Sequence, residues 1–217
     1  MPADVLTETG YPRKRAQTRG RLLRAGMEAI ANGGPEATTV GAIAHIAGVA
    51  PGTLYNHFPS LPDLVAEIEH QLGTGVEIAQ TALDSIENDP ASRVAFGVLQ
   101  LLDMADSDPV AAAAFVALVA SKPEFRARVR AIVGRAIADG AETKRFDVDA
   151  SPAATDAVLG TALQSMRSRI LDDTGAGEAP LAARLVLRLL GVPEAESVAI
   201  VNRTAEILKA EAAPAVP

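Results

Sequence analysis

Hydrophobic residues recur every three or four positions along almost the whole chain, which is the period of amphipathic α-helices rather than of strands. The pattern predicts a helix over about 14–32, two short helices within 38–58, and a long helix that starts at about 61. Later helices are predicted to begin at prolines, which suit a first turn because they lack the amide hydrogen, at Pro90, Pro109, Pro123, Pro152 and Pro180. The predicted fold class is therefore all-α.

The first short helix of the 38–58 segment has clear start and stop signals. Its apolar face follows the i, i+3, i+4, i+7 spacing of a helix, at Val40, Ile43, Ala44 and Ala47. Thr39 stands where a hydroxyl caps a helix N-terminus, with Thr38 as the alternative cap. Gly48 follows the last apolar position and suits the left-handed conformation that ends a helix.

The second short helix is predicted to begin at Pro51 and to bury Leu54 and Phe58. This assignment leaves four polar or aromatic side chains facing largely outward: Thr53, Tyr55, Asn56 and His57. Two small helices joined by a glycine-containing turn, the second presenting hydrogen-bonding groups, are the plan of a helix-turn-helix DNA-binding motif.

Composition limits the other possibilities. The chain carries a net charge of −7, but residues 1–60 hold six Lys/Arg and four Asp/Glu, so the negative charge lies in the remainder. A basic end on an acidic protein fits a module of which only one end meets phosphate. Cysteine is absent, and no apolar run reaches the ~18 residues of a membrane span, so we expect a cytoplasmic protein without a membrane partner.

The segment AGVAPGTLYNHFPSLPDLV resembles the recognition-helix signature of the TetR family of transcriptional regulators, and the similarity extends back to about Ala16. The resemblance implies an N-terminal three-helix helix-turn-helix DNA-binding domain over 13–60. It implies a C-terminal helical effector-binding and dimerisation domain over 61–211. The function expected from it is that of a homodimeric, one-component repressor, released from its operator by a small-molecule effector.

The candidate DNA contacts are the residues that these patterns place outward near the motif: Arg15, Thr39, Pro51, Gly52, Thr53, Tyr55, Asn56 and His57. Thr39 suits a phosphate at a helix N-terminus, and Arg15 suits the phosphate footprint. Asn56 is the candidate base contact, because its amide pairs bidentately with adenine, although a solvated surface role is an equal alternative. Family members often carry lysine at the positions of Pro51 and Leu61, and this sequence lacks both.

Regulation needs two such heads about 34 Å apart on a palindromic operator of double-stranded DNA, which requires a two-fold dimer. The helices 152–173 and 180–190 are the candidate dimer helices, unless their apolar stripes pack only within the chain. The run 110–120 has no polar face and predicts a helix buried on all sides. The candidate effector-pocket residues, each of which is more often an ordinary core or surface position than a ligand contact, are His70, Gln71, Gln100, Met104, Phe115, Gln164 and Met166.

Two other function classes compete with this interpretation. An enzyme is disfavoured, because His45, His57 and His70 are not spaced as a helical metal pair and no nucleophile or phosphate-loop motif is present. We therefore expect no catalytic residue, no metal and no cofactor. The second alternative is a helical small-molecule-binding protein with weakened or lost DNA binding, which the missing lysines would explain.

Overall fold

The computed structural model describes residues 11–86, 88–172 and 178–212, and side chains within these except at 11, 12, 76–86, 211 and 212. The described residues form helices and connecting turns without a strand, as the sequence predicted. The helices are α1 (Tyr11–Gly33), α2 (Val40–Ala47), α3 (Gly52–Tyr55), α4 (Leu61–Ile86), α5 (Pro90–Ser107), α6 (Pro109–Ser121), α7 (Pro123–Glu142), α8 (Pro152–Asp172), α9 (Glu178–Leu189) and α10 (Glu194–Ala212).

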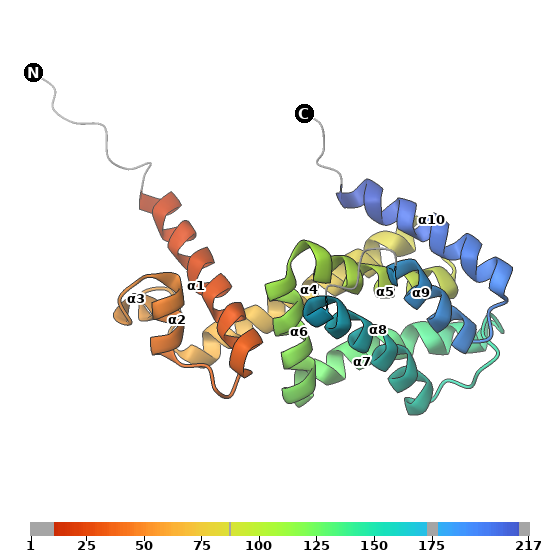
Figure 1. Ribbon diagram of the computed structural model, residues 1–217, viewed down its shortest axis with the longest axis horizontal. Helices are drawn as coiled ribbons and strands as arrows, with labels where there is room; N and C mark the ends of the chain where they lie inside the picture. Colours follow the sequence, from red (N-terminus) through yellow and green to blue (C-terminus); the bar gives the residue numbers. More distant parts are fainter. Residues whose placement is uncertain (1–10, 87, 173–177, 213–217) are drawn as a thin grey trace, which may run out of the picture.

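Helices α1 to α3 form a small head at one end of the molecule, and α4 runs from this head into the body formed by α5 to α10 (Figure 1). Leu22, Ile30, Ile43 and Leu54 are fully buried in the head, and they belong to a core that continues into the body. Helix α1 meets α4 at Gly26, where an added Cβ would lie 2.7 Å from side-chain atoms of both Leu64 and Ile68. The small residue therefore sets how closely α4 is held against the head.

Four helices of the body begin at the proline that the sequence predicted: α5, α6, α7 and α8. Asp89 and Asp108 cap two of them, each accepting a hydrogen bond from a backbone N–H of the first turn. The exception is α9, which begins at Glu178, two residues before Pro180. Residue 173, the predicted end of the helix 152–173, lies outside the described residues.

Helix α6 differs from its prediction. We expected the run 110–120 to be buried on all sides, yet only one face of α6 is fully buried, around Phe115 and Leu118. Its other face is partly open and, with Ala31 of α1 and Leu171 of α8, borders a shallow groove. The prediction failed because alanine is apolar enough for a core and small enough to be tolerated at a surface.

Candidate functional site

The turn between α2 and α3 has the conformation that its sequence predicted. Gly48 is left-handed, with φ 63° and ψ 42°, and the Thr39 hydroxyl caps α2 by accepting a hydrogen bond of 3.2 Å from the Ala42 N–H. Thr38, the alternative cap, instead donates its hydroxyl to the Gly34 carbonyl at 2.9 Å. The Arg21 guanidinium donates to the Ala47 carbonyl at the end of α2, so α1 also holds the turn in place.

Helix α3 consists of a single turn that is anchored by one side chain. Leu54 is fully buried, and Phe58, just beyond the helix, is buried beneath the Arg19 guanidinium, which lies 5.0 Å from the ring centre. Tyr55 is 57% exposed, although most large hydrophobic side chains in the described part of the chain are covered. This inward anchoring leaves the remaining surface of α3 free for a partner.

Six of the eight candidate DNA contacts belong to α3 or stand directly beside it. Pro51, Gly52 and Asn56 are exposed, whereas Thr53 and His57 are half-buried. Thr39 is exposed at the start of α2. The structure therefore turns neither Thr53 nor Asn56 into the core.

Arg15 comes from α1 to join this surface. It borders an open hollow between α1 and α3 together with Lys14, Thr18, Asn56 and His57. Lys14 and Thr18 stand one helical turn apart, and the Thr18 hydroxyl donates to the Lys14 carbonyl at 3.0 Å. Thr18 was missed from the sequence because a threonine on a helix surface has no signal of its own. Its i+4 spacing from Lys14 could have indicated a shared face.

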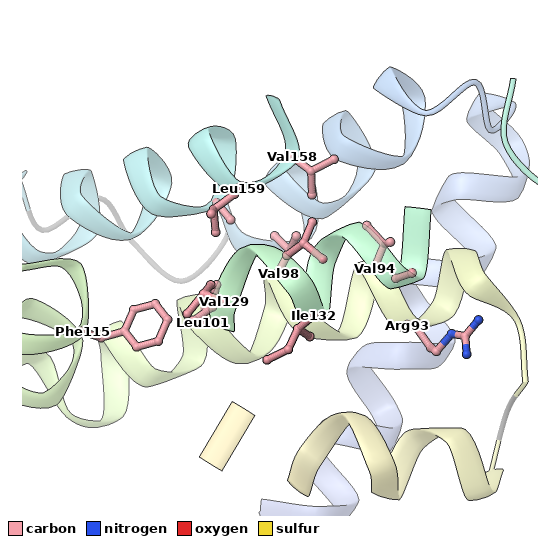
Figure 2. Close-up of a pocket in the computed structure, with 13 residues that line it drawn as sticks. Arg93, Val94, Val98, Leu101, Phe115, Val129, Ile132, Val158 and Leu159 are labelled. Carbon is pink, nitrogen blue, oxygen red and sulfur yellow. The ribbon is translucent and has the colours of Figure 1, made fainter. Parts of the chain in front are cut away.

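A second candidate site lies in the body, where an apolar cavity is enclosed by α5, α7 and α8, with Phe115 of α6 at one end (Figure 2). Its free volume is about 50 Å³, far below the several hundred Å³ of a typical ligand pocket. Phe115 is held in place by an edge-on contact with Phe125, with ring centres 5.4 Å apart. A ligand larger than a few atoms must therefore separate the helices that enclose the cavity.

Phe115 is the only one of the predicted effector residues that lines this cavity. Met166 is fully buried in the core, Met104 is partly buried, and both lie outside the lining. The Gln100 amide donates to the Gly75 carbonyl of α4 at 3.2 Å. Met104 and Met166 therefore contribute to apolar packing, and Gln100 contributes a hydrogen bond between helices, outside the cavity.

The other polar candidates lie on the surface. His70 and Gln71 are exposed on α4, where Gln71 donates to Glu67 at 3.3 Å and His70 Nδ1 lies 3.4 Å from the Thr74 hydroxyl. Gln164 borders a different, open groove between α8 and α9. The sequence identified these side chains by type, but only the packing of the helices decides which of them face a common cavity.

Helices α8 and α9 carry an unusual surface. The described residues expose five large hydrophobic side chains, one of which is Tyr55. The other four are Leu171 at the end of α8 and, on α9, the three residues that we call the leucine stripe, Leu181, Leu185 and Leu189; they are exposed by 72%, 38%, 55% and 43%. Three of them follow one another at four-residue spacing along α9, whose opposite face is buried against the body. An apolar patch of this kind marks an interaction surface.

Ion pairs connect the head with the rest of the protein. Arg24 of α1 donates to both carboxylate oxygens of Asp108 at 2.5 Å, and Arg19 lies 3.2 Å from Glu67 of α4. Burial raises the pKa of Asp108, but the hydrogen bonds from Arg24 and from the first turn of α6 lower that pKa below its ordinary value. Asp108 ends α5 and caps α6, so the head is attached directly to the junction of two body helices.

Comparison with known families agrees with this architecture. Residues 22–68 match the model of the bacterial regulatory proteins of the tetR family, and residues 89–203, more than half of the chain, match the tetracyclin repressor-like C-terminal domain. The chain belongs to the TetR family. It is a DNA-binding transcriptional regulator, and the first of the two matched regions contains the helix-turn-helix described above. TetR regulators as a class are non-enzymatic, and homodimers and repressors are typical of the family.

Solved structures with the TetR fold include RolR in complex with resorcinol, which is 24% identical over 88% of this chain and 96% of its own, with a TM-score of 0.58. A γ-butyrolactone receptor, described as ArpA-like, is 19% identical over 89% and 98%, with a TM-score of 0.68. CprB from S. coelicolor A3(2), a TetR family protein, is 20% identical over 89% and 98%, with a TM-score of 0.66. No curated protein matches this chain.

Two further properties concern only the described residues. None of their helices is long and apolar enough to cross a bilayer. They also hold no group of three or more His, Cys, Asp or Glu side chains suited to a metal ion.

Proposed function

We propose that this TetR regulator is a repressor that binds a palindromic operator as a homodimer and leaves it when a small molecule occupies the body. The observation that carries the proposal is the surface of the head. The exposed side of α3 and the basic start of α1 border one hollow, which holds Lys14, Arg15 and Asn56. Cationic groups beside an exposed recognition helix are what phosphate contact and base readout require together.

Within this surface, the residues divide by chemistry. Arg15, Thr39, Thr53, Tyr55 and His57 contact phosphates through their cationic, hydroxyl or imidazole groups. Asn56 reads a base through its amide, and its exposure supports this role.

Two residues at the start of α3 act through size and shape. The glycine at position 52 lets the backbone approach the floor of the groove, and Pro51 offers an apolar contact to a thymine methyl group. Both are exposed, which supports these roles.

The leucine stripe supports dimerisation through α8 and α9. In an isologous interface, the stripe of one protomer packs against the stripe of its partner, so the exposed leucines of both protomers become covered. The four helices then form a bundle of the kind common in all-α proteins. Such a dimer holds two heads at a fixed distance, which allows them to reach successive major grooves on one face of DNA.

The narrowness of the cavity supports control by a small molecule. The cavity has about 50 Å³ of free volume, so the described arrangement binds a ligand poorly. A ligand binds more tightly to an arrangement in which α5, α7 and α8 are further apart. Helix α4 joins the body to the head, and the ring of Phe125 on α7 lies 3.6 Å from a Cβ built on Gly73 of α4. Movement of α7 is therefore transmitted to α4, and the spacing of the two heads changes.

The test is selection of bound sequences from random double-stranded DNA by the full-length protein, repeated with Asn56→Ala and Tyr55→Phe. We expect the native protein to enrich a palindrome. Asn56→Ala should relax the base preference at one position of each half-site, and Tyr55→Phe should lower the affinity without changing the sequence preference. Unchanged selection with Asn56→Ala would remove this residue as the base contact. No enrichment by the native protein would instead favour a helical small-molecule-binding protein without DNA recognition.

A further inference from the structure

The cavity of the body differs sharply in chemistry between its wall and one end. Among the described residues that line it, Arg93 is the only one with a polar side chain, and the others are aliphatic residues, a glycine and Phe115. Figure 2 shows Arg93 at the end opposite Phe115, with its guanidinium turned away from the valine and leucine side chains. The cavity is therefore apolar along its length, and a guanidinium lies beyond one end of it.

Arg93 is bound across this end of the cavity to the neighbouring helix. Its Nη2 atom donates to Asp139 Oδ2 at 3.0 Å, which joins α5 to α7. The Arg93 side chain is only 16% exposed, whereas that of Asp139 is 50% exposed. If the Asp139 carboxylate leaves Arg93, water can therefore solvate it. The Arg93 guanidinium is less exposed, and the aliphatic part of its side chain lines the cavity.

We propose that the effector is a small amphiphilic acid, whose aliphatic tail lies between α5, α7 and α8 and whose carboxylate takes the place of Asp139 on Arg93. This inference rests on the proposed function, because it names the ligand of the same cavity. A half-buried guanidinium binds a carboxylate through charge-assisted hydrogen bonds. An alcohol of equal length fills the same apolar space but forms only a neutral hydrogen bond there.

Displacement of Asp139 has a consequence for the fold. The Arg93–Asp139 pair is a contact between the two helices that a ligand must separate, so an acid removes this contact as it enters. An acid therefore binds the arrangement with separated helices more tightly than the closed one, and both its tail and its carboxylate contribute to the difference. A ligand shifts an equilibrium only by its difference in affinity for the two states, and this exchange supplies such a difference.

The experiment compares sodium hexanoate with hexanol on the full-length protein at neutral pH. Dissociation constants are obtained from the rise in Tm with ligand concentration, followed by circular dichroism. We expect hexanoate to bind about tenfold more tightly than hexanol. Arg93→Met should abolish this preference and leave hexanol binding unchanged. Asp139→Asn should strengthen hexanoate binding several-fold, because the competing carboxylate is removed. The matched control is Arg135→Met, an exposed arginine of α7 outside the cavity lining, which should alter neither ligand.

Equal affinity for the two ligands, a preference that survives Arg93→Met, or binding of neither ligand overturns the proposal. If Arg93→Met fails to fold, Asp139→Asn decides: removal of the competing carboxylate should strengthen hexanoate binding and leave hexanol binding unchanged, whereas a loosened contact between α5 and α7 would strengthen both. Release of operator DNA is measured separately. Tight, Arg93-dependent binding of hexanoate without release of DNA supports the ligand class and refutes the effector role. Absence of binding with intact operator selection refutes the ligand class alone.

Discussion

Leu185→Asp, in the middle of the leucine stripe, should separate the dimer and weaken operator binding. Leu185 is 55% exposed in the single chain, and full burial of a leucine is worth about 1.5–3 kcal/mol, so covering the exposed half contributes roughly 1–1.5 kcal/mol per copy. A two-fold interface contains the residue twice, which gives roughly 2–3 kcal/mol for the dimer. The two introduced carboxylates also lose water and repel each other.

The dimer dissociation constant should therefore rise by about two orders of magnitude or more. Sedimentation velocity over a range of protein concentrations measures the dimer midpoint, and fluorescence anisotropy measures affinity for the selected operator. The control is Ala131→Asp, which adds the same charge at an exposed position of α7 outside the stripe, and circular dichroism checks that both variants fold. A variant that keeps the wild-type dimer midpoint while remaining folded would show that α9 packs only within its own chain.

Three further changes test the head and the body. Gly48→Ala forces a side chain into the left-handed region and should cost about 1–2 kcal/mol in urea unfolding. Gly20→Ala is its control, since nothing lies within 4 Å of the added Cβ and α1 should gain about 0.5–1 kcal/mol. Arg15→Gln should lower affinity equally for all DNA sequences and reduce the slope of log affinity against log salt by about one. Arg145→Met should cost about 1.5–3 kcal/mol at pH 7, because Arg145 donates to both oxygens of the Asp89 carboxylate at 2.8 and 3.3 Å and also pairs with Glu196 at 2.9 Å. Burial raises the pKa of Asp89, but the hydrogen bonds from Arg145 and from the Ala91 N–H together lower this pKa by more. The pKa of Asp89 therefore lies below its ordinary 3.8 in the folded state. The stabilisation is therefore complete above about pH 4 and is lost at lower pH, so the two unfolding curves should converge there.

Each of these three has an outcome that refutes its reasoning. Gly48→Ala with wild-type stability would mean that the turn adopts another conformation. A sequence-dependent effect of Arg15→Gln would make this arginine a base contact. A loss of stability on Arg145→Met that stays constant down to pH 2 would show that packing, and not the Asp89 charge, is what Arg145 contributes.

Local signals determined the head and most helix boundaries. Thr39, Gly48 and the prolines act through their own backbone conformation and capping groups, so a few neighbouring residues suffice to predict them. The pattern of apolar positions likewise predicted the buried Leu54 and the exposed Asn56, because helical period alone decides which side of so short a helix faces inward. The exposed residues in and beside α3 that we propose for DNA contact were therefore predictable from this one stretch, whereas the hollow that Arg15 and Thr18 border with Asn56 depends on the packing of α1.

The cavity was decided by tertiary structure. Its wall joins residues from 93 to 162, and of the polar side chains proposed from sequence none lines it, whereas Arg93 does. Nothing near Arg93 in the sequence reveals that α7 brings Asp139 to within 3.0 Å of it. The same holds for α6, whose alanines are covered on one face and open on the other. Periodicity states which face of a helix turns inward, but only the packed arrangement of the helices determines what that face meets.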